Sequence, residues 1–315
     1  MNERSILSLE NLADEEIDHL LDLAGTFREE GIPETHPGRF VCGLFFNPSL
    51  RTRTSLEIAT ASLGAHCVIH DVGRDTWSLE HEDGAVMDGD KSEHVRDAVG
   101  KFLSGAVDCL GVRNFEDHEL VAAIAEASAV PVINLETRIA HPMQGLSDLL
   151  VLRNHLKGTP ADHTIALTWA YHPKPLPMAV ANTALLAFCR AGYRVKLVHP
   201  EGYDLNSMFA TRAKEYAGDR LTVHHDMDEG LAGANVIYAK SWGAVSGAPS
   251  RIEHRGWIVD ERRQALGVPG AFMHCLPVRR NVVVSDAVLD GPHSWVAEQS
   301  RSRVFTQAAV LHELL

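Results

Sequence analysis

A short segment of the chain, residues 45–55, concentrates groups that bind anions. It reads Phe-Phe-Asn-Pro-Ser-Leu-Arg-Thr-Arg-Thr-Ser and carries two guanidinium and four hydroxyl groups. An apolar run precedes it and helical periodicity follows it. The segment therefore joins a strand to a helix, where backbone N–H groups and the positive end of the helix dipole converge. Arg51 and Arg53 favour a phosphate or carboxylate there, because a guanidinium group binds an oxyanion through two donors. The alternative is a helix capped by Ser49 with two solvated arginines; the density of the cluster favours anion binding.

The elements around that segment alternate between strands and helices. Apolar runs predict strands at 40–46, 66–70, 107–112, 131–134, 164–169, 194–198, 221–224, 235–238 and 271–274. Helical periodicity predicts helices at 54–63, 92–103, 116–127, 146–156, 178–190, 205–217 and 304–314. Elements that alternate in this way form parallel sheets with right-handed crossovers. A chain of 315 residues is long enough for two such domains.

We therefore expect an α/β fold with two doubly wound parallel-sheet domains joined by helices and the active site in the cleft between them. The first domain covers 1–145, the second covers 146–303, and the C-terminal helix 304–315 packs back on the first. Ligands of open parallel sheets bind at the carboxyl ends of the strands. Polar residues follow most of the predicted strands: 49–53, Arg113, Glu136, 141–144, 170–177, 240–242 and 275–281.

Each of these residues has an ordinary explanation when it is taken alone. Arg113 could pair with an acidic neighbour on the surface, His141 could be a packed loop histidine, and Cys275 could be an inert core thiol. Together, however, they place groups able to bind a ligand at most strand ends of one doubly wound protein. The set as a whole predicts a binding site.

Composition limits the class of protein. The formal net charge of −13 argues against a nucleic-acid surface, although a local basic pocket can still bind a small anion. The sequence contains no run of 18 apolar residues, so no membrane span is predicted. Five scattered cysteines without a Cys-x-x-Cys pair are typical of buried thiols in a reducing cytoplasm. The 18 histidines include no His-Glu-x-x-His motif, so no metal site is predicted.

Three segments resemble, in sequence and in order, the three signatures of the aspartate/ornithine carbamoyltransferase family: 49–53, 141–144 and 274–277. The resemblance covers essentially the whole chain. Four further segments resemble the N-acylornithine branch of that family: 45–49, 168–176, 238–242 and 276–281. The Asp-x-x-x-Ser-Met-Gly type of loop that plain ornithine transferases usually carry is not found.

The resemblance implies an enzyme that moves the carbamoyl group of carbamoyl phosphate to the δ-amine of an N-acylornithine, in arginine biosynthesis. N-acylcitrulline and phosphate are the products, and neither a cofactor nor a covalent enzyme intermediate is needed. The family forms homo-oligomers, usually trimers that share active sites. The alternatives are an ordinary ornithine carbamoyltransferase and a non-catalytic paralogue that binds a phosphorylated metabolite. A nicotinamide enzyme is disfavoured because no Gly-x-Gly-x-x-Gly follows a strand.

The resemblance also assigns roles to individual residues. Carbamoyl phosphate would be bound in the first domain, with the C-terminal segment, by Ser49, Leu50, Arg51, Thr52, Trp77, Arg113, His141, Pro142, Met143, Gln144 and Arg303. The acylornithine would be bound by Glu136, His172, Lys240, Cys275, Leu276 and Arg279. Of these, the catalytic residues would be Arg113, His141, Gln144, Cys275 and Arg303.

Three of the assigned residues need further comment. Trp77 would reach the active site of a neighbouring subunit. Cys275 would act mainly through its backbone carbonyl, which with that of Leu276 accepts hydrogen bonds from the δ-amine. Arg303 ends the segment Gln-Ser-Arg-Ser-Arg, where the family usually has Glu-x-x-Asn-Arg. Gln299 and Ser302 therefore both depart from the pattern, and Arg301 competes with Arg303 for the role.

The identity of the acyl group is predicted from Ser92. This residue lies in segment 88–94, which resembles the loop that distinguishes acetyl-type from succinyl-type members of the family. Acetyl-type members carry Glu there and succinyl-type members carry Pro. A Glu would repel the second carboxylate of a succinyl group, whereas Ser would tolerate it; the ordinary role of Ser92 is to cap a helix. Val283, where acetyl-type members carry Lys, is also more like the succinyl type. The sequence therefore favours N-succinylornithine, with N-acetylornithine as the alternative.

Overall fold

The computed structural model describes residues 5–84, 92–244, 246–247 and 252–315. The chain divides into two compact units: Met1–Leu146 with Arg303–Leu315, and Ser147–Ser302. Arg303 thus belongs with the first unit, whereas the sequence placed it at the end of the second domain. No helix in the described part of the chain is both long enough and apolar enough to cross a membrane.

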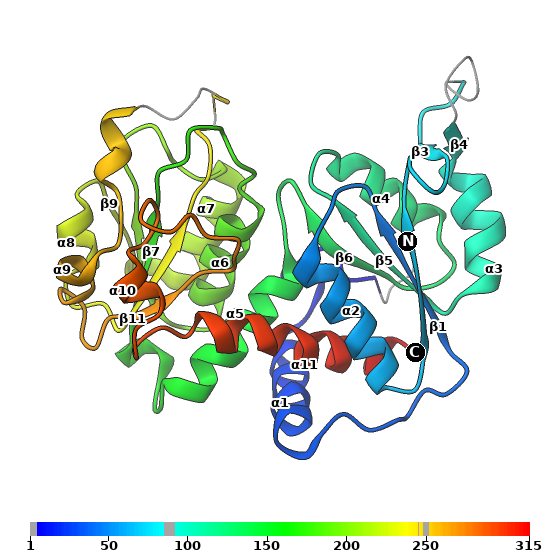
Figure 1. The fold of residues 1–315 in the computed structure, drawn as a ribbon, viewed down its shortest axis with the longest axis horizontal. Coiled ribbons are helices and arrows are strands. Elements are labelled where there is room, and N and C mark those ends of the chain that lie inside the picture. Colours follow the sequence, from blue (N-terminus) through cyan, green and yellow to red (C-terminus); the bar gives the residue numbers. More distant parts are fainter. Residues whose placement is uncertain (1–4, 85–91, 245, 248–251) are drawn as a thin grey trace. The chain divides into compact units, whose positions relative to one another are not determined.

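The first unit is built on a four-stranded sheet in which every neighbouring pair is parallel (Figure 1). Its strand order is β2-β1-β5-β6, with β1 at Phe40–Phe45, β2 at His66–Asp71, β5 at Cys109–Asn114 and β6 at Val132–Thr137. Strands β1, β5 and β6 are mostly buried, as is usual for parallel strands covered on both faces, whereas the edge strand β2 is partly exposed. The helices of this unit are α1 (Asp14–Glu30), α2 (Leu50–Ser62), α3 (Ser104–Ala106) and α4 (His118–Ala127), with the 3-10 turn η1 (Leu9–Asn11).

The second unit has a five-stranded, all-parallel sheet. Its order is β11-β10-β7-β8-β9, with β7 at Thr164–Trp169, β8 at Arg194–Val198, β9 at Leu221–His224, β10 at Val236–Lys240 and β11 at Ala271–Met273. Its helices are α6 (Ala179–Arg190), α7 (Ser207–Ala217), α8 (Met227–Leu231), α9 (Glu261–Gln264) and α10 (Asp286–Leu289), with 3-10 turns η3 (Pro160–Asp162), η4 (Gly218–Arg220) and η5 (Ile252–Gly256). The prediction of an α/β protein with parallel sheets is confirmed.

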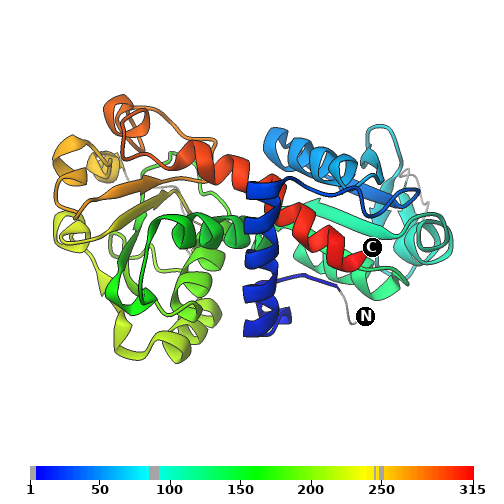
Figure 2. The same cartoon turned by 90° about the horizontal axis from the view of Figure 1, so that it is seen from below.

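Two helices have residues in both units. Helix α5 (Pro142–His155) leaves the first unit after Leu146, and α11 (Val296–Leu314) enters it at Arg303. The last turns of α11 lie beside α1, where His19 Nε2 is 2.9 Å from Glu313 Oε1 (Figure 2).

Each strand order reverses at one position, and such switch points are where open parallel sheets bind ligands. In the first unit this position lies between β1 and β5; in the second it lies between β7 and β10. Gly43 of β1 and Gly111 of β5 are register partners. A Cβ atom on either would lie 3.1 or 3.4 Å from Leu56 Cδ2. The missing side chains therefore let α2 pack close to the sheet at the switch point.

The cysteines form no disulfide, and four of the five are buried. Burial raises the pKa of the Cys42 and Cys109 thiols to about 12, so both stay protonated near neutral pH. These thiols behave as small apolar side chains.

The prediction of a helix over 92–103 is wrong at its start. Residues Ser92–His94 form strand β4, which pairs in parallel with β3 (Ser78–Glu80), and only Arg96–Leu103 (η2) is helical, with π-type hydrogen bonds. The apolar periodicity that suggested the helix comes from residues 95–103. It carries no information on the long-range pairing that holds 92–94.

Candidate active site

The loop between β1 and α2 has the geometry of an anion site. Helix α2 begins at Leu50, four residues earlier than predicted, because Ser49 is extended (φ −155°) and its Oγ accepts the Thr52 N–H at 3.3 Å. Arg51 and Thr52 therefore lie in the first turn of a 13-residue helix, where N–H groups and the helix dipole attract negative charge. The first turn contains no acidic residue to compete with a ligand.

Arg53 does not share this role. Its guanidinium group pairs with Asp71 at 3.4 Å and with Glu57 at 3.3 Å, and its side chain is 42 % exposed. The expectation that both arginines of the segment form an anion cradle is therefore wrong for Arg53. The helical register explains this result, because Arg51 and Arg53 are two residues apart and point to different sides of α2.

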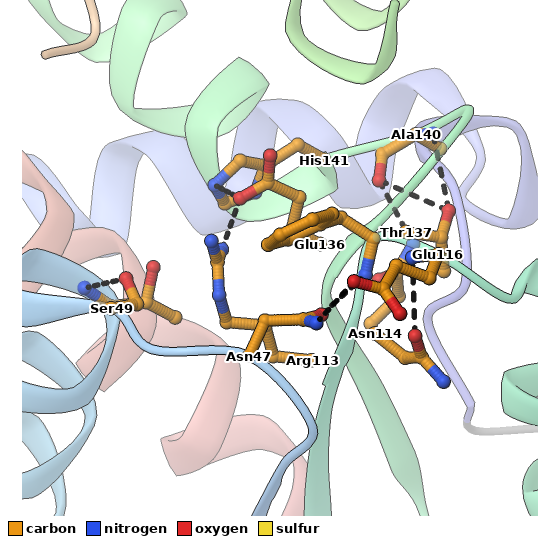
Figure 3. Close-up of polar contacts among 12 residues, drawn as sticks. Asn47, Ser49, Arg113, Asn114, Glu116, Glu136, Thr137, Ala140 and His141 are labelled. Carbon is orange, nitrogen blue, oxygen red and sulfur yellow. Dashed lines mark hydrogen bonds and ion pairs between the residues drawn. The ribbon is translucent and has the colours of Figure 1, made fainter. Parts of the chain in front are cut away.

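A buried asparagine fixes this loop to the neighbouring strand end (Figure 3). Asn47 Oδ1 accepts the Phe115 N–H at 3.0 Å, and Asn47 Nδ2 donates to Glu116 Oε1 at 3.3 Å. Asn114 Oδ1 in turn accepts the N–H groups of Glu116 and Asp117 at 3.1 Å each. The sequence did not single out these residues as functional. Their signal was weak: an Asn before Pro and an Asn at a strand end are also common turn residues.

Arg113 and His141, which are buried, form one cluster with the partly buried Glu136 at the end of the sheet (Figure 3). Phe45 of β1 pairs with Arg113 of β5, which pairs with Glu136 of β6, and a register shift lies between Val112 and Arg113. Arg113 Nη1 donates to Glu136 Oε2, and His141 Nε2 is 3.7 Å from the same oxygen. The ion pair is largely shielded from solvent, and it holds the arginine because breaking such a pair leaves a charge without its partner.

Arg113 and Glu136 lie within strands, not after them as predicted, because β5 and β6 both extend past the apolar runs. Arg113 is 8 % exposed, and its guanidinium carbon lies 5.5 Å from the centre of the Phe115 ring. A buried cation beside an aromatic face has little water to screen it. Glu136 offsets the charge of Arg113, but the Arg113 Nε has no hydrogen-bond partner within the described residues, so the guanidinium group keeps a donor for an anion.

A tight turn connects β6 to α5 and orients His141. The Thr137 N–H donates to Ala140 O at 2.9 Å, and the Ala140 N–H donates to Thr137 Oγ1 at 3.2 Å (Figure 3). Helix α5 then begins at Pro142, which is a favoured first residue because it lacks an N–H donor. Met143 and Gln144 of this first turn are buried.

Arg303 lies against the anion loop from the far end of the sequence. Its Nη2 donates to Thr52 Oγ1 at 2.6 Å, and the two residues are 3 % and 1 % exposed. The competing Arg301 is exposed to solvent. The structure thus brings Arg303 to the helix α2 N-terminus, which sequence spacing alone could not decide.

Two residues assigned to the phosphate side face solvent. Leu50 is 78 % exposed and Trp77 is 50 % exposed. Ser92, by contrast, is 7 % exposed and pairs with Ser78 across β3 and β4. Residues 88–91 of the proposed specificity segment lie outside the described residues.

The second unit places its candidates at its own switch point. Trp169, the last residue of β7, is the register partner of Lys240, the last residue of β10, and the Ala170 N–H donates to Lys240 O at 3.0 Å. Trp169 Nε1 donates to Trp242 O at 2.8 Å, which ties together the segments that follow these strands. His172 is turned toward its own loop, since its Nδ1 contacts Lys174 O at 2.8 Å.

The segment after β11 turns sharply. Leu276 has a φ of 56°, in the left-handed region that non-glycine residues rarely adopt. Its N–H donates to His274 Nδ1 at 2.9 Å, and the intervening Cys275 is 7 % exposed. Strained backbone of this kind is concentrated at functional sites. Arg280 pairs with Asp286 and Asp290 at 2.7 and 2.6 Å, whereas Arg279 is exposed.

These features define an α/β protein with a helix N-terminus suited to an anion and a buried arginine at a switch point. Two family models match the chain: aspartate/ornithine carbamoyltransferase, carbamoyl-P binding domain, over residues 4–154, and the Asp/Orn binding domain of the same family over 177–314. The chain belongs to the aspartate/ornithine carbamoyltransferase family, and it is a carbamoyltransferase. The resemblance inferred from the motifs is confirmed.

The chain is similar to N-acylornithine carbamoyltransferases and, at lower identity, to ornithine carbamoyltransferases such as that of Bacillus subtilis, at 30 %. N-acetylornithine carbamoyltransferase of Xanthomonas campestris pv. campestris is 39 % identical over 100 % of this chain and 98 % of its own. N-succinylornithine carbamoyltransferase of Bacteroides fragilis is 35 % identical over 86 % of each chain. A solved structure of a glutamate-to-serine variant of N-acetyl-L-ornithine transcarbamylase, with carbamyl phosphate and N-succinyl-L-norvaline, matches with a TM-score of 0.92 and 38 % identity over 99 % of both chains.

Proposed function

We propose that this enzyme transfers the carbamoyl group of carbamoyl phosphate to the δ-amine of an N-acylornithine, releasing phosphate and N-acylcitrulline in arginine biosynthesis. The observation that carries the proposal is the buried Arg113–Glu136–His141 cluster beside the α2 N-terminus. The names of the similar proteins supply the substrate class.

The first unit would bind carbamoyl phosphate. The N–H groups of the first turn of α2, Arg51 and Arg113 would neutralise the phosphate, whose charge grows as it leaves. Thr52, held by Arg303 at 2.6 Å, and His141 with Gln144 would contact the carbamoyl group and polarise its carbonyl. Fixed donors of this kind need little rearrangement during the reaction, which is how they lower a barrier.

The second unit would bind the acylornithine. The carbonyl groups of Cys275 and Leu276 would accept hydrogen bonds from the δ-amine and direct its lone pair at the carbamoyl carbon. Lys240 would pair with a substrate carboxylate, with His172 and Arg279 shaping the pocket. Glu136, although in the first unit, was also assigned to the acylornithine; its pairing with Arg113 supports a role in holding that arginine as well. That residues of both units act on one pair of substrates stays a prediction.

A homotrimer with shared active sites is part of the proposal. The exposed Trp77 supports it, since a half-exposed indole is a frequent anchor between subunits. The five free cysteines support a reducing cytoplasm as the place where the enzyme works.

For the acyl group, we propose N-succinylornithine. Ser92 would add no charge beside the acyl chain, and variants of a similar enzyme in which alanine, proline, serine or valine replaces a glutamate were solved with the same succinyl ligand. N-acetylornithine is the second candidate, because the Xanthomonas relative is the more similar in sequence.

Steady-state rates with ornithine, N-acetylornithine and N-succinylornithine test the proposal. We expect the highest kcat/KM for N-succinylornithine and poor turnover of free ornithine. A preference of more than about tenfold for the acetyl compound, equivalent to about 1.4 kcal/mol, would contradict the succinyl assignment. Efficient use of free ornithine would contradict the acylornithine assignment as a whole.

Replacing Ser92 with glutamate is expected to lower kcat/KM for N-succinylornithine by about tenfold relative to N-acetylornithine. The introduced carboxylate would repel the second carboxylate of the succinyl group. Ser92→Gln is the matched control, since it adds nearly the same volume without the charge. Equal effects of the two substitutions on both substrates would show that charge at this position does not select the acyl group.

A further inference from the structure

Gln299 of α11 is the centre of a buried polar connection in the second unit. Its Oε1 accepts the His274 N–H at 2.9 Å, and its Nε2 donates to Asp148 Oδ1 at 2.6 Å. Its backbone carbonyl accepts the Ser147 hydroxyl at 2.8 Å. Gln299, Asp148 and His274 are 1 %, 0 % and 2 % exposed, so no solvent competes for these bonds.

The segment held by this connection is the sharp turn after β11. His274 is its first residue, and the His274 ring accepts the Leu276 N–H at 2.9 Å. The backbone is therefore fixed at its start by the Gln299 side chain and at its bend by the His274 side chain. Leu276, at a φ of 56°, keeps a conformation that is unfavourable unless the surroundings impose it.

An amide suits this position because it offers a donor and an acceptor at once. Asp148 needs the donor and the His274 N–H needs the acceptor. A glutamate, which is usual in the family at this place, would set a second carboxylate against Asp148 unless one of the two carried a proton. Burial, together with the nearby Asp148 carboxylate, raises the pKa of the Tyr238 phenol, so that it stays protonated.

We propose that Gln299 is a positioning residue for the acceptor amine: it sets the direction of the Cys275 and Leu276 carbonyl groups by holding the His274 N–H. The inference rests on the proposed function, since those carbonyls are the groups assigned to the δ-amine. Gln299 is 1 % exposed and its amide is bonded to His274 and Asp148, so it would act on the substrate only through them. Replacing Gln299 should therefore lower kcat/KM for the acylornithine and leave the KM for carbamoyl phosphate nearly unchanged.

The first test is Gln299→Met, which keeps the length of the side chain and removes both hydrogen bonds. We expect kcat/KM for the acylornithine to fall by about tenfold or more, because small misplacements of reacting groups are costly. The KM for carbamoyl phosphate should stay within about twofold, because its proposed ligands lie in the other unit. Gln307→Met is the matched control. Gln307 lies in the same helix and is 1 % exposed, and its amide atoms have no hydrogen-bond partner within the described residues.

The second test is Gln299→Glu, read as a pH profile. At low pH the introduced carboxyl group and Asp148 would share a proton and keep the connection; as pH rises and the proton is lost, two adjacent carboxylates would push the segment apart. The acylornithine kcat/KM of this variant should therefore fall at high pH, where that of the wild type rises as the δ-amine loses its proton. This second variant decides the matter if Gln299→Met does not fold.

Three results would overturn the inference. The first is wild-type kinetics in Gln299→Met. The second is that Gln299→Met changes the kinetic constants for both substrates equally and lowers the melting temperature as much as Gln307→Met does. The third is a pH profile of Gln299→Glu that parallels that of the wild type. A wild-type protein that transfers no carbamoyl group would instead overturn the proposed function, which separates the two failures.

Discussion

Arg113→Met is expected to lower kcat/KM for carbamoyl phosphate by about 10³-fold, the loss typical of removing a buried donor aimed at developing charge. Arg113 is almost fully buried, and its partner Glu136 is also close to His141. Its charge acts in a region of low dielectric, where electrostatic interactions are strong. The variant should be compared with the wild type in steady-state rates and in melting temperature, since Glu136 loses its partner.

Arg53→Met is the matched control for this experiment. Arg53 lies in the same anion-binding segment, but its guanidinium group pairs with Asp71 and Glu57 on an exposed side of α2. Exposed pairs contribute little, so the control should keep its rate within about threefold of the wild type. If Arg53→Met lost as much activity as Arg113→Met, the assignment of the phosphate site to the buried cluster would be wrong.

Arg303→Met is expected to lower kcat/KM by about 10²-fold, because one donor to the carbamoyl group is lost and Thr52 loses its orientation. The Arg303–Thr52 hydrogen bond joins residues 251 positions apart in the sequence and is shielded from solvent. The KM for the acylornithine at saturating carbamoyl phosphate should change little.

Arg301→Met separates the role of Arg303 from a general effect of positive charge on α11. Arg301 is two residues away on the same helix and faces solvent. We expect near wild-type rates for this variant. A loss confined to Arg301→Met, with Arg303→Met active, would show that the wrong arginine was placed in the site.

The parallel sheets could be predicted because parallel strands buried on both faces are short apolar runs that periodicity finds. The strand ends were less accurate. Arg113 and Glu136 are polar, so the apolar runs stopped before them, yet both continue their strands through backbone pairing. The strand at Ser92–His94 was missed for the same reason, because its partner β3 is another short polar segment.

The candidate site was predictable in its residue types but not in its pairings. Nothing in the order Arg51-Thr52-Arg53 shows which arginine is held away by carboxylates. The choice between Arg301 and Arg303 depends on the distance to Thr52, which only the fold determines. Asn47 and Gln299 were missed as functional residues because their importance lies in which backbone N–H groups they hold.

In the proposed reaction the amine of the N-acylornithine receives the carbamoyl group and phosphate is released, one molecule of each product per turnover. The most direct test mixes the enzyme with N-succinylornithine and carbamoyl phosphate labelled at the carbonyl carbon, and measures the amounts of both products. We expect labelled N-succinylcitrulline and free phosphate in equal amounts, with both lost together in Arg113→Met. Phosphate released without labelled N-acylcitrulline, from either the succinyl or the acetyl substrate, would contradict it.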